Sequence, residues 1–416
     1  MKTHCSNNRS YSHYNSVATR FDRLTGGLFT EGRSGILLAV SGGWALSIGV
    51  RFVYPALVPY FRPKLGMSLS AVGLLLTLLW GAYAVGHIPG GMLGDSLGEG
   101  NLLVISMIVA ALTVGIVAGA VNVWMLFVGT VGFGVASALY GPTRFTILND
   151  IYPDRSGSAI GLTMAAGSVG NAALPVIATT VATILSWRYG FGLFFPLFLI
   201  ALWSIWYFVP HNTSPQTTAA DSISIATLQE ILNLLKRSSF RAIVTVQVCL
   251  SFVIQGFTSF YPQYLVSIKD ITPRIAALLL SLFFITGAVI QPISGRLVDS
   301  FGLRYTLGGF LVSCTAGLWV LHIVDSLPFL MLGTVLFSSW NGCPVVTQTY
   351  IVDVLPKSVQ GTGFGILKAG WMVVGATSPL IIGLLGDFGY FSQGFLILTL
   401  IGSSSLLILI KYVRLS

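Results

Sequence analysis

The sequence predicts an all-α integral membrane protein with twelve transmembrane helices, organised as two parallel six-helix repeats. Three observations predict this fold. The 416 residues are 54% hydrophobic and only 8% charged, whereas a soluble domain carries about 25% charged residues. Apolar runs of the length that crosses a bilayer, about 20 residues, recur along the chain, and landmarks of the first half return in the second. Soluble enzymes, disordered chains and secreted disulfide scaffolds are therefore excluded.

Twelve apolar runs, separated by charged or Pro/Gly-rich breaks, are the predicted spans. They cover residues 35–60, 69–93, 101–120, 123–149, 158–185, 189–210, 241–266, 273–297, 303–323, 327–352, 361–385 and 391–413. The first six form an N-terminal bundle over 35–210, and the last six form a C-terminal bundle over 241–413. The polar tail 1–34 contains no short apolar core with a cleavage site, so we expect no removable signal peptide.

Lysine and arginine residues are distributed unevenly between the two sides of the predicted membrane. With the N-terminus inside, fourteen of the 22 lie in cytoplasmic tails and loops, five on the opposite side and three within spans. Positive residues accumulate on the cytoplasmic side, so both termini are predicted to be cytoplasmic in a multi-pass plasma-membrane protein. This distribution also accounts for the net charge of +9 without nucleic acid, because no basic patch is interleaved with aromatic residues.

The hydrophilic stretch 211–240 is a predicted cytoplasmic linker between the two bundles. Its apolar residues recur at helical intervals and predict a short amphipathic helix on the cytoplasmic membrane face. These residues are Ile225, Leu228, Ile231, Leu232 and Leu235. The alternative is a disordered tether with a chance periodicity.

The two halves of the chain share landmarks at a constant spacing. Gly91–Gly98 matches Gly295–Gly302 at five of eight positions, 204 residues later, and Asp150–Pro153 is repeated as Asp353–Pro356 after 203 residues. Six spans separate the copies, and because six is even, both halves have the same orientation. Such parallel repeats are related by an axis along the membrane normal, as in transporters that rock one bundle against the other.

The loop Gly91–Gly98 and its copy Gly295–Arg304 resemble the cytoplasmic signature of the major facilitator superfamily. That signature is a Gly-x-Leu-x-Asp run followed by Gly and basic residues between helices 2 and 3. Trp187-Arg188 and the Gly/Pro-bearing fifth span are also similar to that superfamily, and the resemblance covers residues 35–413. It implies two six-helix bundles around a central cavity and alternating access, without specifying the substrate.

The resemblance implies a gating role for Asp95 and Asp299. A carboxylate at a helix end can accept N–H groups from the N-terminus of a neighbouring helix, and in the family this contact latches the outward-open state. The second copy keeps a basic residue, Arg304, whereas Ser96–Asn101 has none, so the latch is expected to be asymmetric. The alternative for both carboxylates is ordinary solvation of a helix end.

Three charged residues lie deep inside predicted spans, away from their ends, and all are cations: Arg51, Arg144 and Lys368. Each is a functional candidate, because a charge at the bilayer centre costs about 2.5–3.5 kcal/mol on insertion scales. No Asp or Glu lies deep in any span, so the site between the bundles is predicted to be positive and to attract an anion. Arg144 and Lys368 could instead reach the cytoplasmic interface, and Arg144 could pair with Asp150.

Polar residues in other spans are further candidates for substrate contact. His87 lies one turn from Tyr83 on span two and is either a core histidine or a protonatable group of the site. Gln255 in span seven and Asn341 in span ten either contact substrate or form hydrogen bonds across helices.

Arg51 followed by Trp80–Gly91 resembles the anion:cation symporter branch, which moves sugar acids, organic acids and phosphate. The resemblance implies that Arg51 and Tyr83 contact the anionic group of the substrate. The Arg and Glu that the branch carries early in helix four are absent, because Val128–Val135 is uncharged, and this absence argues against proton symport. Lys368 is similar to the buried cations of monocarboxylate and oxalate–formate exchangers.

The sequence thus predicts a secondary active transporter of a small organic anion. Arg51 and one inner cation, Arg144 or Lys368, would clamp a carboxylate. The alternatives are an efflux transporter of drugs or other solutes from the same superfamily, and a sensor that has a transporter fold but moves nothing.

An enzyme is not expected, because no His/Asp/Glu or Ser/His cluster lies inside a span and no Gly-rich phosphate loop is present. The cysteines form no metal or redox spacing; they are Cys5, Cys249, Cys314 and Cys343. We expect no cofactor and no metal, a monomer in the lipid bilayer, and a coupling ion or counter-anion that the sequence does not identify.

Overall fold

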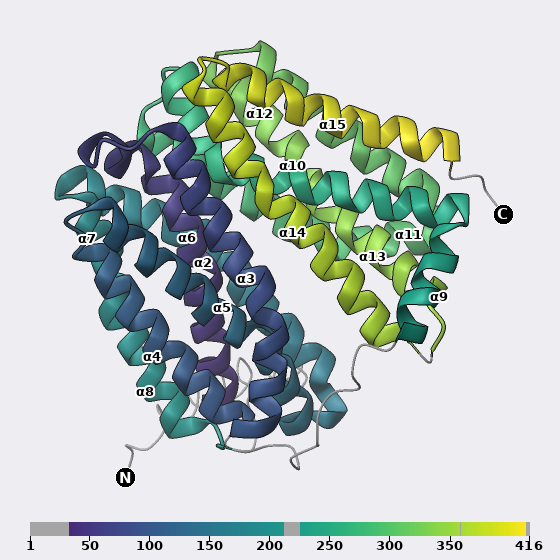
Figure 1. Cartoon of the computed structure of the whole chain (residues 1–416), viewed down its shortest axis with the longest axis horizontal. Helices are drawn as coiled ribbons and strands as arrows, with labels where there is room; N and C mark the ends of the chain where they lie inside the picture. Colours follow the sequence, from purple (N-terminus) through teal and green to yellow (C-terminus); the bar gives the residue numbers. More distant parts are fainter. Residues whose placement is uncertain (1–32, 212–224, 358, 413–416) are drawn as a thin grey trace, which may run out of the picture.

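Helices make up the computed structural model, which describes residues 33–211, 225–357 and 359–412 (Figure 1). The first half comprises α2 (Ser34–Lys64), α3 (Leu69–Leu97), α4 (Glu99–Ala118), α5 (Val123–Ile151), α6 (Ser156–Ile184), α7 (Trp187–Gly192) and α8 (Phe194–Phe208), with a 3₁₀ turn, η1 (Pro153–Arg155). The second half comprises α9 (Ile225–Leu235), α10 (Ser238–Ile268), α11 (Pro273–Ile323), α12 (Leu327–Phe337), α13 (Cys343–Val354), α14 (Gln360–Asp387) and α15 (Phe391–Tyr412), with a second 3₁₀ turn, η2 (Ser338–Gly342). The predicted all-α membrane fold is confirmed.

Each of the twelve predicted spans coincides with helix to within a few residues. Spans eight and nine share α11, which is broken at Gly302 by a backbone φ of 76° and ψ of 166°. Span six is divided between α7 and α8, and span ten between α12, η2 and α13. The described residues contain eleven continuous apolar helical stretches. Because the break at Gly302 divides α11 into two spans, these stretches correspond to the twelve predicted crossings.

The break at Gly302 gives a direct prediction for stability. Its φ and ψ lie in a region that is essentially restricted to glycine, where another residue costs about 1–3 kcal/mol. Gly302→Ala should therefore lower the free energy of unfolding by that amount, although a Cβ there would meet no atom within 4 Å. Thermal unfolding of the purified protein measures the change.

The matched control for this prediction is Gly309→Ala in the same helix. A Cβ at Gly309 also has open space, and its φ is not positive. Alanine has the higher helix propensity by about 1 kcal/mol, so the control should be neutral or stabilising. Equal effects of the two substitutions would contradict backbone strain as the cause.

Close contact between α6 and α2 in the first half positions the Trp44 side chain of α2. A Cβ at Gly167 of α6 would collide with the indole of Trp44, and one at Gly170 would collide with the carbonyl of Ala45. These glycines therefore let α6 approach α2 closely, as small residues do between membrane helices. Trp44 thus packs against α6, and its ring centroid lies 5.8 Å from the guanidinium carbon of Arg51.

The two halves meet at one end of the molecule and diverge toward the other. Figure 1 shows the first half, in purple to teal, touching the second half, in green to yellow, at the top of the view. Every hydrogen bond between described residues of the two halves involves an α3 residue from Leu69 to Trp80. We call this the joined end; it holds the turns at 65–68 and 388–390, and the opposite, separated end holds the first residues of α2 and α14.

The helix α9 lies in the predicted linker, at the separated end. It packs against α10 and α14, and its side chains Ile231 and Leu234 are buried. Ile231 lies near Gly363 of α14, so protein covers part of the apolar face that the sequence analysis assigned to the membrane surface. The side chains of Ile225 and Leu228 lie outside the described part of the structure.

Candidate functional site

Arg51 is buried in α2 among aromatic rings. Only 2% of the residue is exposed, and its guanidinium carbon lies 3.7 Å from the centroid of the Tyr83 ring and 5.4 Å from that of Trp80. The third ring is Trp44, two helical turns earlier on α2, at 5.8 Å. The Nε atom of Arg51 is buried and has no hydrogen-bond partner among the described residues.

Arg144 lies on α5, on the other side of Trp44. Its guanidinium carbon is 3.4 Å from the centroid of the Trp44 ring and 4.0 Å from that of Phe145, and 3% of the residue is exposed. Nη1 donates to the carbonyl of Gly141 at 2.5 Å, and Nη2 contacts the sulfur of Met164 at 3.3 Å. Trp44 therefore has a cation near its ring from each of two helices.

Tyr83 and His87 of α3 lie beside this cluster, where α3 crosses α5. His87 Nδ1 is 2.6 Å from the Tyr83 carbonyl, and the two rings meet edge to face at 4.4 Å. A Cβ at Gly141 would lie 3.1 Å from His87 Nε2 and 3.7 Å from the Tyr83 hydroxyl. Gly141 thus leaves room for both side chains, and the same residue accepts the hydrogen bond from Arg144.

Lys368, the third of the predicted cations, belongs to the second half. It is exposed on α14, the helix of the second half that packs against α3, which carries Tyr83 and His87. The structure therefore brings together four of the seven predicted substrate residues, from α2, α3 and α5, while Lys368 lies on α14, which packs against α3.

The cluster carries positive charge without a balancing carboxylate. No ion pair within the described part of the chain involves Arg51, Arg144 or Lys368. Removing an ion from water costs several kcal/mol, and a cation–π contact returns about 2 kcal/mol even when desolvated. The aromatic rings therefore offset only part of the cost, and an anion at this position would complete the balance.

An aromatic layer separates the cluster from the joined end. Phe52 lies 5.4 Å from Trp80 within the first half and 4.4 Å from Phe284 of the second half, between ring centroids. Trp80 Nε1 also donates to Ser259 of α10 at 3.2 Å. Because Phe52 follows Arg51 directly, the halves make contact immediately beside the predicted site.

Two other predicted substrate residues lie within the second half. Gln255 Nε2 approaches the carbonyl of Met372 on α14 at 3.4 Å, and its Oε1 has no partner among the described residues. Asn341 donates to the carbonyl of Ser338 at 3.0 Å and packs against Gly287 of α11. No contact between either residue and the cation cluster is found, and their substrate role stays a prediction.

The predicted gating residues lie near the separated end. Asp299 is exposed just before the break at Gly302, and Arg304 Nη2 approaches the carbonyl of Ile410 at 3.5 Å. The backbone of Asp95 belongs to α3, but its side chain lies outside what the structure describes. Their role in gating stays a prediction.

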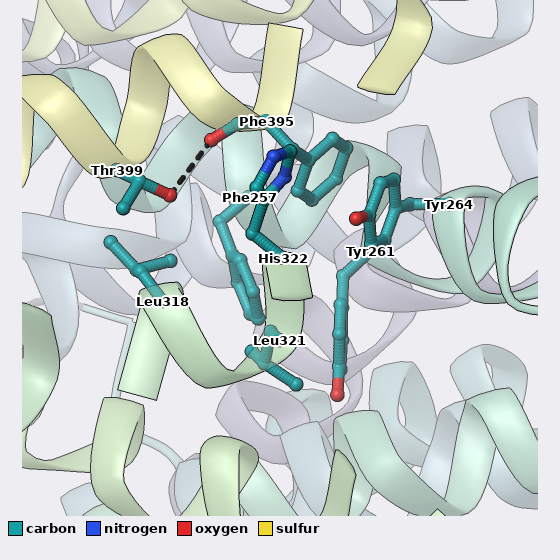
Figure 2. A pocket seen from close by; sticks show the side chains of 8 residues that line it. All are labelled: Phe257, Tyr261, Tyr264, Leu318, Leu321, His322, Phe395 and Thr399. Carbon is teal, nitrogen blue, oxygen red and sulfur yellow. Dashed lines mark hydrogen bonds between the residues drawn. The ribbon is translucent and has the colours of Figure 1, made fainter. Parts of the chain in front are cut away.

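A separate pocket lies inside the second half, between α10, α11 and α15 (Figure 2). It is lined by Phe257, Tyr261, Tyr264, Leu318, Leu321, His322, Phe395 and Thr399. The rings of Tyr264 and Phe395 are stacked with their centroids 3.9 Å apart, and those of Phe257 and Tyr261 are stacked with centroids 4.3 Å apart. The lining contains no Lys, Arg, Asp or Glu, so this pocket does not match an anionic or strongly cationic substrate.

Sequence reasoning missed Trp44, which contacts both arginines. A signal was present, because Trp44 precedes Arg51 by seven residues and so lies on the same face of α2. Metal binding has no support in the described residues, where no three His, Cys, Asp or Glu side chains come together.

Comparison with known proteins identifies relatives along almost the whole chain. The sequence profile of the Major Facilitator Superfamily matches residues 39–273 and 267–416. The hexuronate transporter of Bacillus subtilis is 22% identical over 378 residues, covering 86% of this chain and 89% of that protein. The probable sulfoacetate transporter SauU of Cupriavidus necator is 24% identical over 362 residues, covering 79% and 81%.

A solved structure shares the fold. The nucleoside transporter NupG superposes with a TM-score of 0.77 at 10% sequence identity, covering 93% of this chain and all of that chain. At this identity the likeness concerns the fold alone.

Proposed function

The chain belongs to the Major Facilitator Superfamily, and we propose that this multi-pass membrane transporter carries a small organic anion of the carboxylate type by alternating access. The family makes it a transporter of a small molecule rather than an enzyme, as the sequence predicted. One observation carries the choice of substrate: Arg51 and Arg144 are buried around Trp44 with no carboxylate paired to them among the described residues, and Lys368 of α14 adds a third positive charge from the other half.

The names of two relatives agree with this substrate class. Hexuronate and sulfoacetate are both organic anions. A guanidinium presents its donors in a planar fork that matches a carboxylate or a sulfonate. In the proposal, Arg51 binds the anionic group, Arg144 adds positive potential from α5, and Lys368 approaches from the second half.

Tyr83 controls access to Arg51 in this proposal. In the structure its ring covers the guanidinium at 3.7 Å, so the anion reaches Arg51 only after the ring rotates. Release then reverses the exchange, because the aromatic faces take back the guanidinium when the anion leaves. A cation–π contact is weaker than a charge-assisted hydrogen bond between a guanidinium and an anion in a desolvated site. The difference between these two interaction energies favours binding of the substrate.

The orientation in the plasma membrane follows from the distribution of Lys and Arg. Among the described residues, loop cations such as Arg33, Arg155 and Lys236 lie at the separated end, and such residues favour the cytoplasm. In the proposal the joined end faces outward, and the separated end opens to the cytoplasm. Alternating access requires a second state in which the contacts of α3 at the joined end are broken and the separated end has closed.

Lys368 couples the substrate to this movement. Closing the separated end brings Lys368 toward Arg51 and Arg144, and like charges repel in a poorly solvated site. A bound anion removes this repulsion. The loaded protein therefore closes more readily than the empty one, which favours exchange of one anion for another.

Uptake by proteoliposomes tests the proposal. Vesicles containing the protein and preloaded with a hexuronate should take up labelled hexuronate much faster than empty vesicles, and neutral hexoses should not compete. Uptake of lipophilic cations without any response to organic acids would show a drug efflux transporter instead.

A further inference from the structure

The joined end contains a contact between a carboxylate and a helix N-terminus that belong to different halves. Asp387, the last residue of α14, accepts the backbone N–H of Leu69 at 2.7 Å with Oδ1 and that of Ser70 at 3.0 Å with Oδ2. Leu69 and Ser70 are the first two residues of α3. Their N–H groups have no acceptor within their own helix, so Asp387 supplies it from the other half.

The position of Asp387 is unfavourable for its own helix. A negative side chain at a helix C-terminus faces the negative end of the helix dipole, whereas at an N-terminus it is stabilising. The first turn of α3 contains no acidic residue; its own cap is Ser68, which accepts the N–H of Ala71 at 3.0 Å. The charge that α3 lacks is therefore supplied by Asp387.

The backbones of the two helices pack closely below this contact. A Cβ at Gly383 would collide with the carbonyl of Leu69, and one at Gly73 with the carbonyl of Pro379. Further along, the N–H of Leu380 donates to the Thr77 hydroxyl at 3.1 Å. Asp387 thus terminates a continuous contact between α3 and α14.

The repeat shows that this contact is specific to one pair of helices. At the spacing of 204 residues, Leu69 corresponds to Pro273 and Asp387 to Thr183. Proline has no backbone N–H, and the Thr183 hydroxyl is 2.6 Å from that of Tyr60 within its own half. The pseudo-equivalent helices α6 and α11 pack together without a carboxylate at this position, so the fold does not require one.

We infer that Asp387 is a latch that holds the joined end closed by capping α3 across the two halves. Opening this end removes the carboxylate from Leu69 and Ser70 and leaves both N–H groups to water. The latch therefore favours the state open at the separated end. It rests on the alternating access proposed above, but it does not depend on the identity of the substrate.

The test is the distance between the halves at the joined end. Spin labels at Val121→Cys and Phe329→Cys, both exposed there and away from the latch, report it by double electron–electron resonance in a background without the natural cysteines. Asp387→Asn should raise the population with the longer distance about fivefold, the effect of losing a charge of this kind at a helix terminus. Asp387→Glu keeps the charge and should stay close to the original distribution.

Two further variants make the result decisive. Asp270→Asn removes an exposed carboxylate from the same end of the same half and should change nothing. Gly383→Ala inserts a Cβ against the carbonyl of Leu69 and should lengthen the distance whatever Asp387 does. A response to Gly383→Ala but not to Asp387→Asn overturns the latch alone, and no response to either overturns alternating access together with the latch.

Discussion

Arg51→Met is expected to weaken anion binding strongly while making the empty protein more stable. Arg51 is 2% exposed and lies among aromatic rings with no ion pair among the described residues. Replacing even a buried ion pair by apolar side chains of similar volume is often neutral or stabilising by about 1–4 kcal/mol, and Arg51 bears the desolvation cost without such a partner. Loss of a buried charged contact weakens binding by about 2–5 kcal/mol, so anion affinity should fall by a factor of about 30 or more.

Thermal unfolding with and without substrate measures both effects of Arg51→Met. The matched control is Arg188→Met: Arg188 also lies over a ring, 4.6 Å from the Trp187 centroid, and it donates to the carbonyl of Ala120 at 2.9 Å. The control should leave anion binding unchanged and lower the melting temperature slightly. A large loss of stability in Arg51→Met, with normal binding by the folded remainder, would assign Arg51 to packing instead.

Lys368→Gln is expected to impair transport far more than binding. Lys368 is exposed and belongs to the other half, so in the present state it adds a solvent-screened attraction to an anion held by Arg51. We expect a loss of affinity of less than tenfold, since exposed charge pairs contribute about 0.2–1 kcal/mol. Exchange should fall further, because the side chain that draws the second half onto the bound anion has lost its charge.

Binding by thermal stabilisation and exchange by proteoliposomes separate the two effects of Lys368→Gln. The matched control is Lys357→Gln, which replaces an exposed lysine just before α14. It should alter neither anion binding nor exchange. Equal losses of binding and exchange in Lys368→Gln would make Lys368 an ordinary binding residue, and no loss of either would place it outside the mechanism.

The sequence was sufficient for the fold because the signals for a membrane helix are local. Apolar length set each span, and Gly302 of the repeated loop motif lies where the backbone kinks between spans eight and nine. The linker helix was also visible in the sequence, but its packing was not, because the position of Gly363 beside Ile231 depends on how α14 meets α9.

The site was only partly predictable, for a physical reason. Counting residues gives the depth of a side chain along its span, and the cations were found in this way. Depth does not give the direction in which a helix faces or the neighbour that covers a side chain. The rings of Trp44 and Tyr83 over the two arginines therefore came from the structure alone.

The partner of Asp387 was hidden for the same reason. The partners Leu69 and Ser70 are more than 300 residues away in the chain, and no local pattern connects them. The one local signal was an acidic residue at a helix C-terminus, where a basic residue is favoured.

The central claim, that the cations between the halves bind an organic anion, is tested most directly by ligand-dependent melting of the purified protein. A panel of hexuronates and other small carboxylates, sulfonates, neutral sugars and lipophilic cations would be compared in the wild type. A ligand at 100 times its Kd adds about 2.7 kcal/mol of stability. We predict that only organic anions raise the melting temperature, whereas stabilisation by lipophilic cations or neutral sugars without any effect of anions would contradict the account.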